Sequence, residues 1–209
     1  MNRTRDTKGN ILKVALHRAS RHGLESLSFG ELAKEVNMSK SGLFAHFKSK
    51  ENLQIMVFDL ASEVFREKVM VPSVAAPRGV PRILALSRNW LYWEDDEFPG
   101  GCPIITATVE FDDRPGKLRD HVFKLQVQWM KGLSFAAQLA VQEGHFHAAA
   151  DPDQFAFELY SYMLGYHLHK RMMNDPNAFE RQKKAFQELL WRNCSDEYRT
   201  TSDLFSQSK

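Results

Sequence analysis

The chain has 209 residues, of which 43% are hydrophobic and 26% charged, with 11 glycines and 8 prolines. This composition is typical of a globular protein of one large or two small domains, and it excludes the disordered and fibrous classes. No stretch of about 18 apolar residues occurs, and the basic first eight residues lack the apolar run of a secretory signal. We therefore expect a cytoplasmic protein with no membrane partner.

The net charge is only +2, but it is distributed unevenly. Residues 1–52 hold 10 Lys/Arg and 5 Asp/Glu, whereas residues 53–209 hold 18 and 21, which gives +5 and then −3. A basic end on a near-neutral body is typical of a module that docks on a polyanion such as nucleic acid. All four tryptophans lie in the second part, which indicates two parts with different tasks.

Metal sites and disulfides are not expected. Cys102 and Cys194 lie far apart and form no CxxC pair, so they are interpreted as two small buried or half-buried thiols. The paired histidines at 145 and 147 and at 167 and 169 would diverge by about 160° on a helix and could not share a metal. The acidic residues 94–97 lack the spacing and central glycine of a calcium loop.

The chain begins with three predicted helices. Apolar residues recur at helical spacing over residues 10–22, and Gly23 helps to supply the stop. Ser28 and Glu31 form a capping box in which Ser28 accepts from the backbone and Glu31 reaches back, so a short second helix is expected. Ser39 can cap a third helix. Two short helices joined so tightly must cross steeply, which is the helix-turn-helix arrangement. The expected inward side chains are Ile11, Leu12, Ala15, Leu16, Ala19, Leu32, Ala33, Val36, Leu43, Phe44 and Phe47, with Lys40, Ser41, Ala45 and His46 outside.

The middle of the chain contains a predicted break. Ser49 can cap a longer fourth helix, and three prolines and a glycine then predict a break over residues 71–81 and a boundary between the halves. The helical pattern resumes at Arg82 and runs to residues 94–97, which we expect to form a solvated helix end. The β-branched residues in 102–111 would suit a strand, but we predict a helix there.

Three further helices are predicted by pairs of a capping residue and a proline. A long amphipathic helix follows Asp112–Pro115, a second runs over residues 151–173 and is apolar on several faces, and a third runs over 176–193. The polar end, residues 195–209, is interpreted as a frayed tail. The pattern predicts an all-α fold of about nine helices.

The N-terminal residues agree in order and spacing with a known motif. They are Ile11-Leu12, Ala15, Gly23, Leu27-Ser28, Leu32-Ala33, Val36, Met38-Ser39-Lys40-Ser41-Gly42-Leu43-Phe44, His46-Phe47 and Ser49-Lys50-Glu51-Asn52-Leu53. On these residues the chain resembles the TetR family of one-component bacterial transcriptional regulators over about residues 7–60. The resemblance implies a helix-turn-helix DNA-binding domain over 1–52, a helical ligand-binding and dimerisation domain over 53–195 and a polar tail over 196–209.

The resemblance also implies which residues contact DNA. The reading helix would be Ser39–Phe47, whose outward residues are placed for base edges in the major groove, while Ser28 and Lys50 match phosphate-binding positions. The family commonly has tyrosine where this chain has Phe44, so a hydroxyl that could bind phosphate is absent. The serines would cap their helices whether or not DNA is near. The candidate DNA-binding residues are Ser28, Ser39, Lys40, Ser41, Gly42, Phe44, His46 and Lys50.

A ligand cavity among the later helices is the second expectation, because the aromatic content exceeds that of a minimal core. The ligand would be a small apolar or amphipathic molecule acting as inducer, and no cofactor is expected. Ordinary core packing is the alternative interpretation of each lining residue. The candidates are Trp90, Trp93, Cys102, Thr106, Phe111, Trp129, Phe135, Tyr162 and Tyr166.

The whole chain is therefore interpreted as a homodimeric repressor. Pairing of the last two helices across a two-fold axis would present two reading helices to a pseudo-palindromic double-stranded operator. The sequence has no GxSxG, HExxH, GxGxxG or P-loop motif, so an enzyme is not expected. The alternative is a helical DNA-binding or partner-binding adaptor without a ligand-sensing role.

Overall fold

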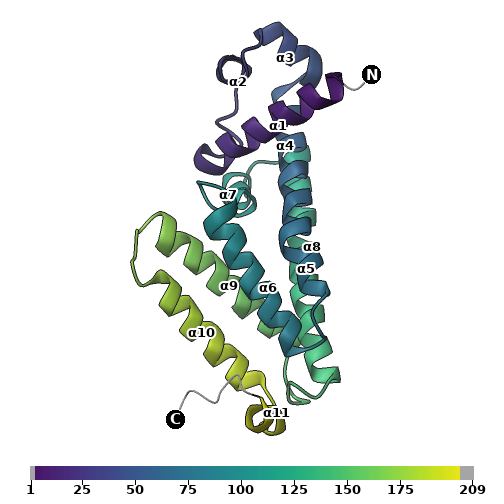
Figure 1. Cartoon of the computed structure of the whole chain (residues 1–209), viewed down its shortest axis with the longest axis vertical. Coiled ribbons are helices and arrows are strands. Elements are labelled where there is room, and N and C mark those ends of the chain that lie inside the picture. Colours follow the sequence, from purple (N-terminus) through teal and green to yellow (C-terminus); the bar gives the residue numbers. More distant parts are fainter. Residues whose placement is uncertain (1–2, 203–209) are drawn as a thin grey trace. The chain divides into compact units, whose positions relative to one another are not determined.

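The computed structural model of the protein describes residues 3–202, with side chains from Thr7 onward. These residues form α-helices, short π-helical segments and loops, with an isolated β-bridge between Phe146 and Cys194 (Figure 1). The predicted all-α fold is confirmed. The chain divides into two compact units, one of Met1–Lys68 with Tyr92–Gln126 and the other of Val69–Leu91 with Val127–Lys209.

The first unit opens with four helices, of which the last three begin at the predicted serines. The hydroxyls of Ser28, Ser39 and Ser49 accept from the backbone N–H three residues further on, at 3.3, 3.0 and 3.1 Å. The capping box at Ser28 is only half formed, because the carboxylate of Glu31 binds Arg18 instead of reaching back. The four helices are α1 (Arg3–His22), α2 (Phe29–Glu35), α3 (Lys40–Phe47) and α4 (Lys50–Phe65).

The predicted break over residues 71–81 begins later than expected. The helical path continues from α4 through a π-helical segment, η1 (Arg66–Met70), into α5 (Val71–Val74). Pro72 lies inside this continuous path, directly after the π-helical segment, and its ring has no N–H to donate to the preceding turn. The helical path is interrupted after Val74, and Gly79, with a φ of +83°, precedes α6 (Val80–Tyr92).

The acidic residues 94–97 form a second π-helical segment, η2 (Trp93–Glu97), and the prediction that they are solvated is wrong for Glu94. That side chain is 0% exposed. Its carboxylate accepts from the backbone N–H of Cys102 at 2.9 Å, at the start of α7 (Pro103–Glu110), where a helix leaves N–H groups without intrahelical acceptors. The helix predicted over 102–111 is confirmed.

Two of the three later helices, α8 and α10, begin a few residues after the predicted caps. Gly116 adopts a φ of +153°, so α8 (Lys117–Gln142) starts beyond Pro115. Asp151 caps α9 (Pro152–Arg171) as predicted. The carboxylate of Asp175 accepts from the N–H of Asn177 at 2.9 Å, and α10 starts only after that turn, spanning Ala178–Asn193.

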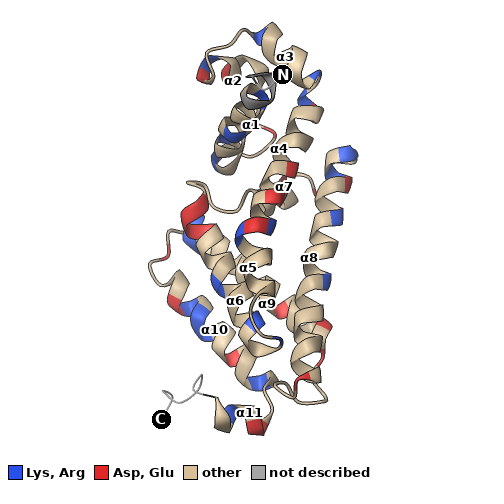
Figure 2. Ribbon diagram, turned by 45° about the vertical axis from the view of Figure 1, so that its right-hand side comes forward, with Lys and Arg blue, Asp and Glu red and all other residues tan. Residues whose placement is uncertain are grey.

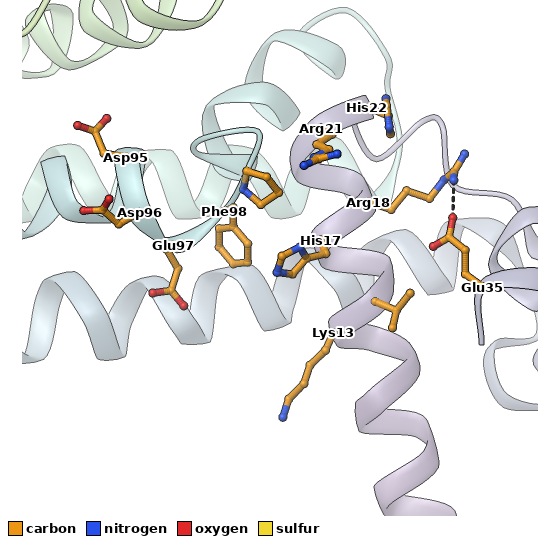
Figure 3. Close-up of a pocket in the computed structure, with 12 residues that line it drawn as sticks. Lys13, His17, Arg18, Arg21, His22, Glu35, Asp95, Asp96, Glu97 and Phe98 are labelled. Atoms are coloured by element: carbon orange, nitrogen blue, oxygen red, sulfur yellow. Dashed lines mark hydrogen bonds and ion pairs between the residues drawn. The ribbon is translucent and has the colours of Figure 1, made fainter. Parts of the chain in front are cut away.

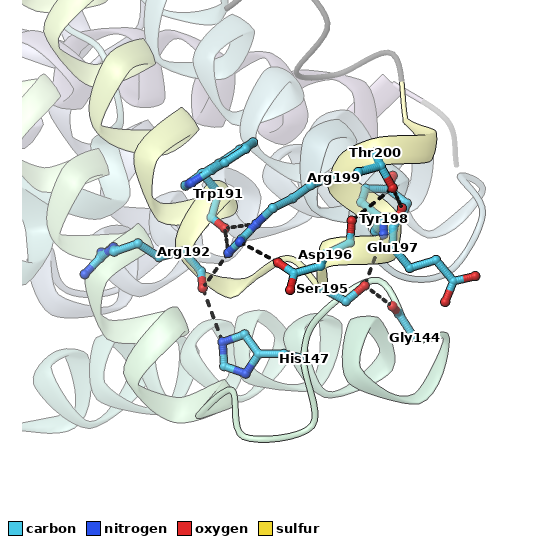
Figure 4. A network of polar contacts seen from close by, with 10 residues as sticks. All are labelled: Gly144, His147, Trp191, Arg192, Ser195, Asp196, Glu197, Tyr198, Arg199 and Thr200. Carbon is cyan, nitrogen blue, oxygen red and sulfur yellow. Dashed lines mark hydrogen bonds and ion pairs between the residues drawn. The ribbon is translucent and has the colours of Figure 1, made fainter.

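The predicted frayed tail is partly helical. Ser195 caps α11 (Asp196–Thr201) through the Tyr198 N–H and donates to the Gly144 carbonyl at 2.7 Å (Figure 4). Arg199 of α11 donates two hydrogen bonds to the backbone carbonyl of Trp191, near the end of α10. Residues 203–209 of the predicted tail lie outside the described residues. No helix within residues 3–202 is long and apolar enough to cross a bilayer.

Candidate nucleic-acid interface

The helix-turn-helix is formed by α2, the residues 36–39 and α3. Asn37 adopts a φ of +53°, and the Met38 N–H donates to the Ala33 carbonyl at 2.9 Å, which ends α2 and turns the chain. Leu43 and Phe47, four residues apart on α3, are both 0% exposed. These two side chains anchor one face of α3 and leave the opposite face exposed.

The exposed face of α3 carries polar groups at its first turn. Lys40 and Ser41 are exposed, and the hydroxyls of Ser39 and Ser41 lie 3.1 Å apart. A Cβ at Gly42 would come within 3.2 Å of the Ser39 hydroxyl, so a larger residue would crowd the cap. Blue segments in Figure 2 place basic residues at this helix and along α1.

Phe44 does not face inward as predicted. It is 52% exposed, and its ring meets the edge of the Phe29 ring at a centroid distance of 5.8 Å. The reason is helical periodicity, since Phe44 lies about 100° around the helix from the buried Leu43. His46, predicted to lie outside, is half-buried beside the Phe47 ring.

Lys50 is engaged within the protein. Its ammonium donates to the Glu25 carbonyl at 2.6 Å and to the Glu25 carboxylate at 3.0 Å. The hydrogen bond from Lys50 holds the pKa of Glu25 below its ordinary value, with a smaller contribution from Gln54 and the charge of Arg114. A phosphate contact by Lys50 would have to share the ammonium with Glu25.

Two basic residues near α3 were missed by the sequence analysis. Lys48 is exposed directly after α3, where its φ is +67°, and the Lys8 ammonium lies 5.7 Å from the centre of the Phe47 ring. Both belong to the basic excess of the first 52 residues. That excess was the available signal, but it did not show which lysines lie beside the reading helix.

A groove of about 810 Å³ lies in the same unit, between α1 and the segment 95–99. Figure 3 shows basic side chains of α1 along one wall and carboxylates along the other. The ring of His17 meets Phe98 edge-on at 5.9 Å, and Glu97 pairs with Lys68 at 3.3 Å. None of these residues was among the predicted site residues.

Comparison with known proteins identifies the family. A family model described as bacterial regulatory proteins, tetR family, matches residues 11–55. A second, described as the C-terminal domain of tetracyclin repressor-like proteins, matches residues 79–186, more than half of the chain. The chain belongs to the TetR family. This is a family of transcriptional regulators, not of enzymes.

Individual TetR-family relatives match only part of this chain or share a low sequence identity with it. The chain is 36% identical over 56 residues to the HTH-type transcriptional regulator AcrR of Shigella flexneri, a match that covers 27% of this chain and only 26% of AcrR. Three solved structures share the fold. A TetR regulator of Chloroflexus aurantiacus has a TM-score of 0.81 at 23% identity, covering 97% of this chain and 98% of that one. A TetR-family regulator of Cytophaga hutchinsonii has a TM-score of 0.79 at 21% sequence identity, covering 93% of this chain and 96% of that one. AibR, solved with isovaleryl coenzyme A and operator DNA, has a TM-score of 0.65 at 23% sequence identity, covering 77% of this chain and 85% of that one.

The candidate ligand residues of this TetR-family chain divide between the two units. Trp93, Cys102, Thr106 and Phe111 belong to the first unit, and Trp90, Trp129, Phe135, Tyr162 and Tyr166 belong to the second. Phe135 is 56% exposed on α8, Thr106 and Tyr162 are half-buried, and the remaining six are buried.

Within the first unit, Trp93 is part of an aromatic cluster. Trp93 meets the rings of Phe65 and Phe98 edge-on, each at 5.2 Å. Thr106 donates to the Cys102 carbonyl at 3.3 Å. Burial, with the nearby Glu94, raises the pKa of the Cys102 thiol to about 12, so the group is a neutral, poorly reactive thiol at neutral pH.

In the second unit, the rings of Trp90 and Tyr166 meet edge-on at 6.1 Å. The hydroxyl of Tyr162 donates to Glu158 at 3.2 Å, and the hydroxyl of Tyr166 accepts from Lys170 at 3.2 Å. Burial, followed by the charge of Glu158, raises the pKa of Tyr162. The two tyrosines have apolar rings and hydroxyls that are already hydrogen-bonded, which suits apolar contact more than charge recognition.

Proposed function

We propose that the chain is a homodimeric repressor that binds a pseudo-palindromic DNA operator through α3 and releases it when a small apolar or amphipathic ligand binds. The exposed first turn of α3, with Lys40 and Ser41 projecting from a helix anchored by Leu43 and Phe47, is the observation that carries this proposal. A rigid helix with outward donors is suited to reading base edges in a major groove.

Direct reading of bases by Ser41 and His46 has a distinctive consequence. Replacing either by alanine should reduce the preference for a selected operator over related sequences while leaving binding to random DNA nearly unchanged. The measurement is fluorescence anisotropy with the selected duplex, its single-base variants and a random duplex. Equal losses on all duplexes would contradict a base-reading role. Lys34→Ala, at an exposed position on α2, is a control outside the reading helix.

Dimerisation is supported by an exposed apolar stripe along α9. Phe157, Leu164, Leu168 and Met172 follow steps of seven, four and four residues, so they lie on one face of the helix, and each is at least 36% exposed. The other face of α9, with Phe155, Leu159, Met163 and Tyr166, is buried within the second unit. On α10, Phe179 and Trp191 are also exposed. If the α9 stripes of two copies pack against each other about a two-fold axis, these apolar side chains become buried.

Ligand sensing is supported by the buried aromatic residues of both units and by the AibR complex, which contains both isovaleryl coenzyme A and operator DNA. The test is thermal shift followed by titration calorimetry with a library of apolar and amphipathic compounds. A saturating shift from a compound that also displaces DNA supports the sensor. Silence across a broad library would favour an adaptor without a ligand-sensing role.

The first experiment for the whole proposal is DNA binding by the intact protein. Affinity for the DNA upstream of its own gene is compared with affinity for random DNA, at low and at physiological salt. A preference of about a thousandfold that survives physiological salt is expected of a specific regulator. Weak, salt-sensitive binding that is equal on both DNAs, together with failure of a genome-wide selection, would overturn the proposal.

A further inference from the structure

The corner that joins α1 to α2 is held by side chains from two other helices. The backbone N–H groups of Leu24 and Glu25 donate to the two carboxylate oxygens of Glu110, at 2.8 and 3.3 Å. The carbonyls of the same two residues accept from Gln54 at 3.0 Å and from Lys50 at 2.6 Å. The four backbone polar groups of this dipeptide are thus bound by side chains of α7 and α4, where a regular helix would bind them itself.

The approach of Glu110 to the corner requires glycine at position 23. Gly23 adopts a φ of +80°, and a Cβ placed on it would lie 1.9 Å from a carboxylate oxygen of Glu110. Leu24 and Leu27, on either side of Glu25, are buried and hold the corner against the core. The position of the corner is therefore held by the packing of the two leucines and by the hydrogen bonds to the Glu110 carboxylate.

We propose that Glu110 is a positioning residue for DNA recognition, which binds the amides of Leu24 and Glu25 and thereby fixes the start of α2 and the orientation of α3. This inference rests on the proposed DNA-binding function. Only two residues separate Glu25 from Ser28, the N-cap of α2, so a shift of the corner moves α2 directly. Farther along α2, Arg18 of α1 binds Glu31 and Glu35, which orients the rest of that helix.

The burial of the Glu110 carboxylate has an energetic cost. Burial raises the pKa of Glu110 even though two backbone amides lower it, so the charged form is less favourable here than in water. An apolar side chain would remove that cost but leave the two amides without their acceptor.

The place of Glu110 on α7 also links the corner to candidate ligand residues. Thr106 lies four residues earlier on the same helix, and Cys102 and Phe111 flank the two ends of α7. All four residues belong to the first unit. A ligand that displaces α7 would move the carboxylate with it, and α2 would lose its fixed starting point without any contact between ligand and DNA.

The test compares the full-length wild type with Glu110→Gln and Glu110→Ala. Glutamine keeps the reach but only one acceptor oxygen, and alanine keeps neither. Glu67→Gln, at an exposed position, is the control for loss of one negative charge. Hydrogen exchange of the Leu24 and Glu25 amides reports on the contact. Binding to a duplex that the wild type selects from a randomised pool, and to a random duplex, reports on recognition.

We expect amide exchange at the corner to rise by at least about tenfold in Glu110→Ala and less in Glu110→Gln. The ratio of selected to random affinity should fall in the same order, by about tenfold for alanine, with no change in Glu67→Gln. A merely structural role would lower the melting temperature without changing that ratio.

Unchanged exchange, or an unchanged affinity ratio, would overturn the proposal. If Glu110→Ala does not fold, Glu110→Gln carries the same comparison. A wild type that selects no sequence would overturn the proposed function, and with it the recognition role of Glu110, while the exchange measurement would still report on the contact by itself.

Discussion

The ammonium of Lys50 has two candidate partners. Its ammonium binds Glu25, and the same position is implied to hold a DNA phosphate. If the ammonium contacts phosphate, Lys50→Ala should weaken binding to selected and random DNA together and reduce the slope of log affinity against log salt by about one. Lys131→Ala, at an exposed position on α8, is the control and should leave the slope unchanged. An unchanged slope in Lys50→Ala would limit that residue to holding Glu25.

Glu110 gives a prediction for the pH dependence of stability. Burial raises its pKa above the ordinary 4.5, with Glu25 also raising it and Arg114 lowering it. The folded state therefore holds this proton more tightly than the unfolded state, so the stabilisation is full below pH 4.5 and is lost as pH rises through the folded pKa. Urea unfolding of wild type and Glu110→Gln is measured from pH 4 to 7. The free energy of unfolding of the wild type should increase relative to that of Glu110→Gln as pH falls. A difference between the two proteins that stays constant with pH would contradict the raised pKa.

At the scale of elements, α11 acts as a cap on α10. The guanidinium of Arg199 donates to the Trp191 carbonyl at 2.6 and 2.9 Å and lies over the Trp191 ring at 4.7 Å (Figure 4). A helix leaves its last carbonyls without intrahelical donors, so this side chain replaces the missing bonds.

Arg199→Ala should therefore lower the free energy of unfolding by about 1–2 kcal/mol, because it removes charge-assisted hydrogen bonds and ring contact together. Arg199→Lys keeps the charge but not the planar fork and should recover only part of the loss. Urea unfolding checks both. Equal stability of all three proteins would show that α11 does not hold the end of α10.

The accuracy of the sequence predictions follows the range of the interaction that decides each feature. Ser39 and Asp151 mark helix starts correctly because a cap bonds within three residues. The burial of Glu94 depends on an N–H eight residues away, and it was predicted wrongly. The hydrogen bond from the Leu24 N–H to Glu110 joins residues 86 positions apart, and no local sequence pattern predicts it. Local signals thus predicted the helix that we propose reads DNA, whereas the contact of Glu110 with the corner before α2 could be found only in the folded structure.

At the scale of the whole molecule, α9 has two apolar faces, and only one of them is buried among the residues that the structure describes. Leu168 is 52% exposed within the stripe of α9, and Leu164 and Met172, one turn before and one turn after it, are exposed apolar residues as well. Solvent exposure of such a stripe is unfavourable, and a second copy offers the same stripe in return. We therefore expect wild type to sediment as a dimer at micromolar concentration, and Leu168→Asp as a monomer because pairing would bury two carboxylates.

The same variant links assembly to DNA. A dimer engages both half-sites of a palindrome, so the second contact is intramolecular and affinity for the full site rises by about a hundredfold or more. Leu168→Asp should lose that gain on the full site while its affinity for a single half-site is unchanged. Phe123→Asp, which places the same charge at a 58% exposed aromatic position on α8, should remain dimeric and keep the gain. If Leu168→Asp stays a dimer, the two-fold interface lies on another face; if it is monomeric but binds the full site at wild-type affinity, one copy is sufficient for recognition.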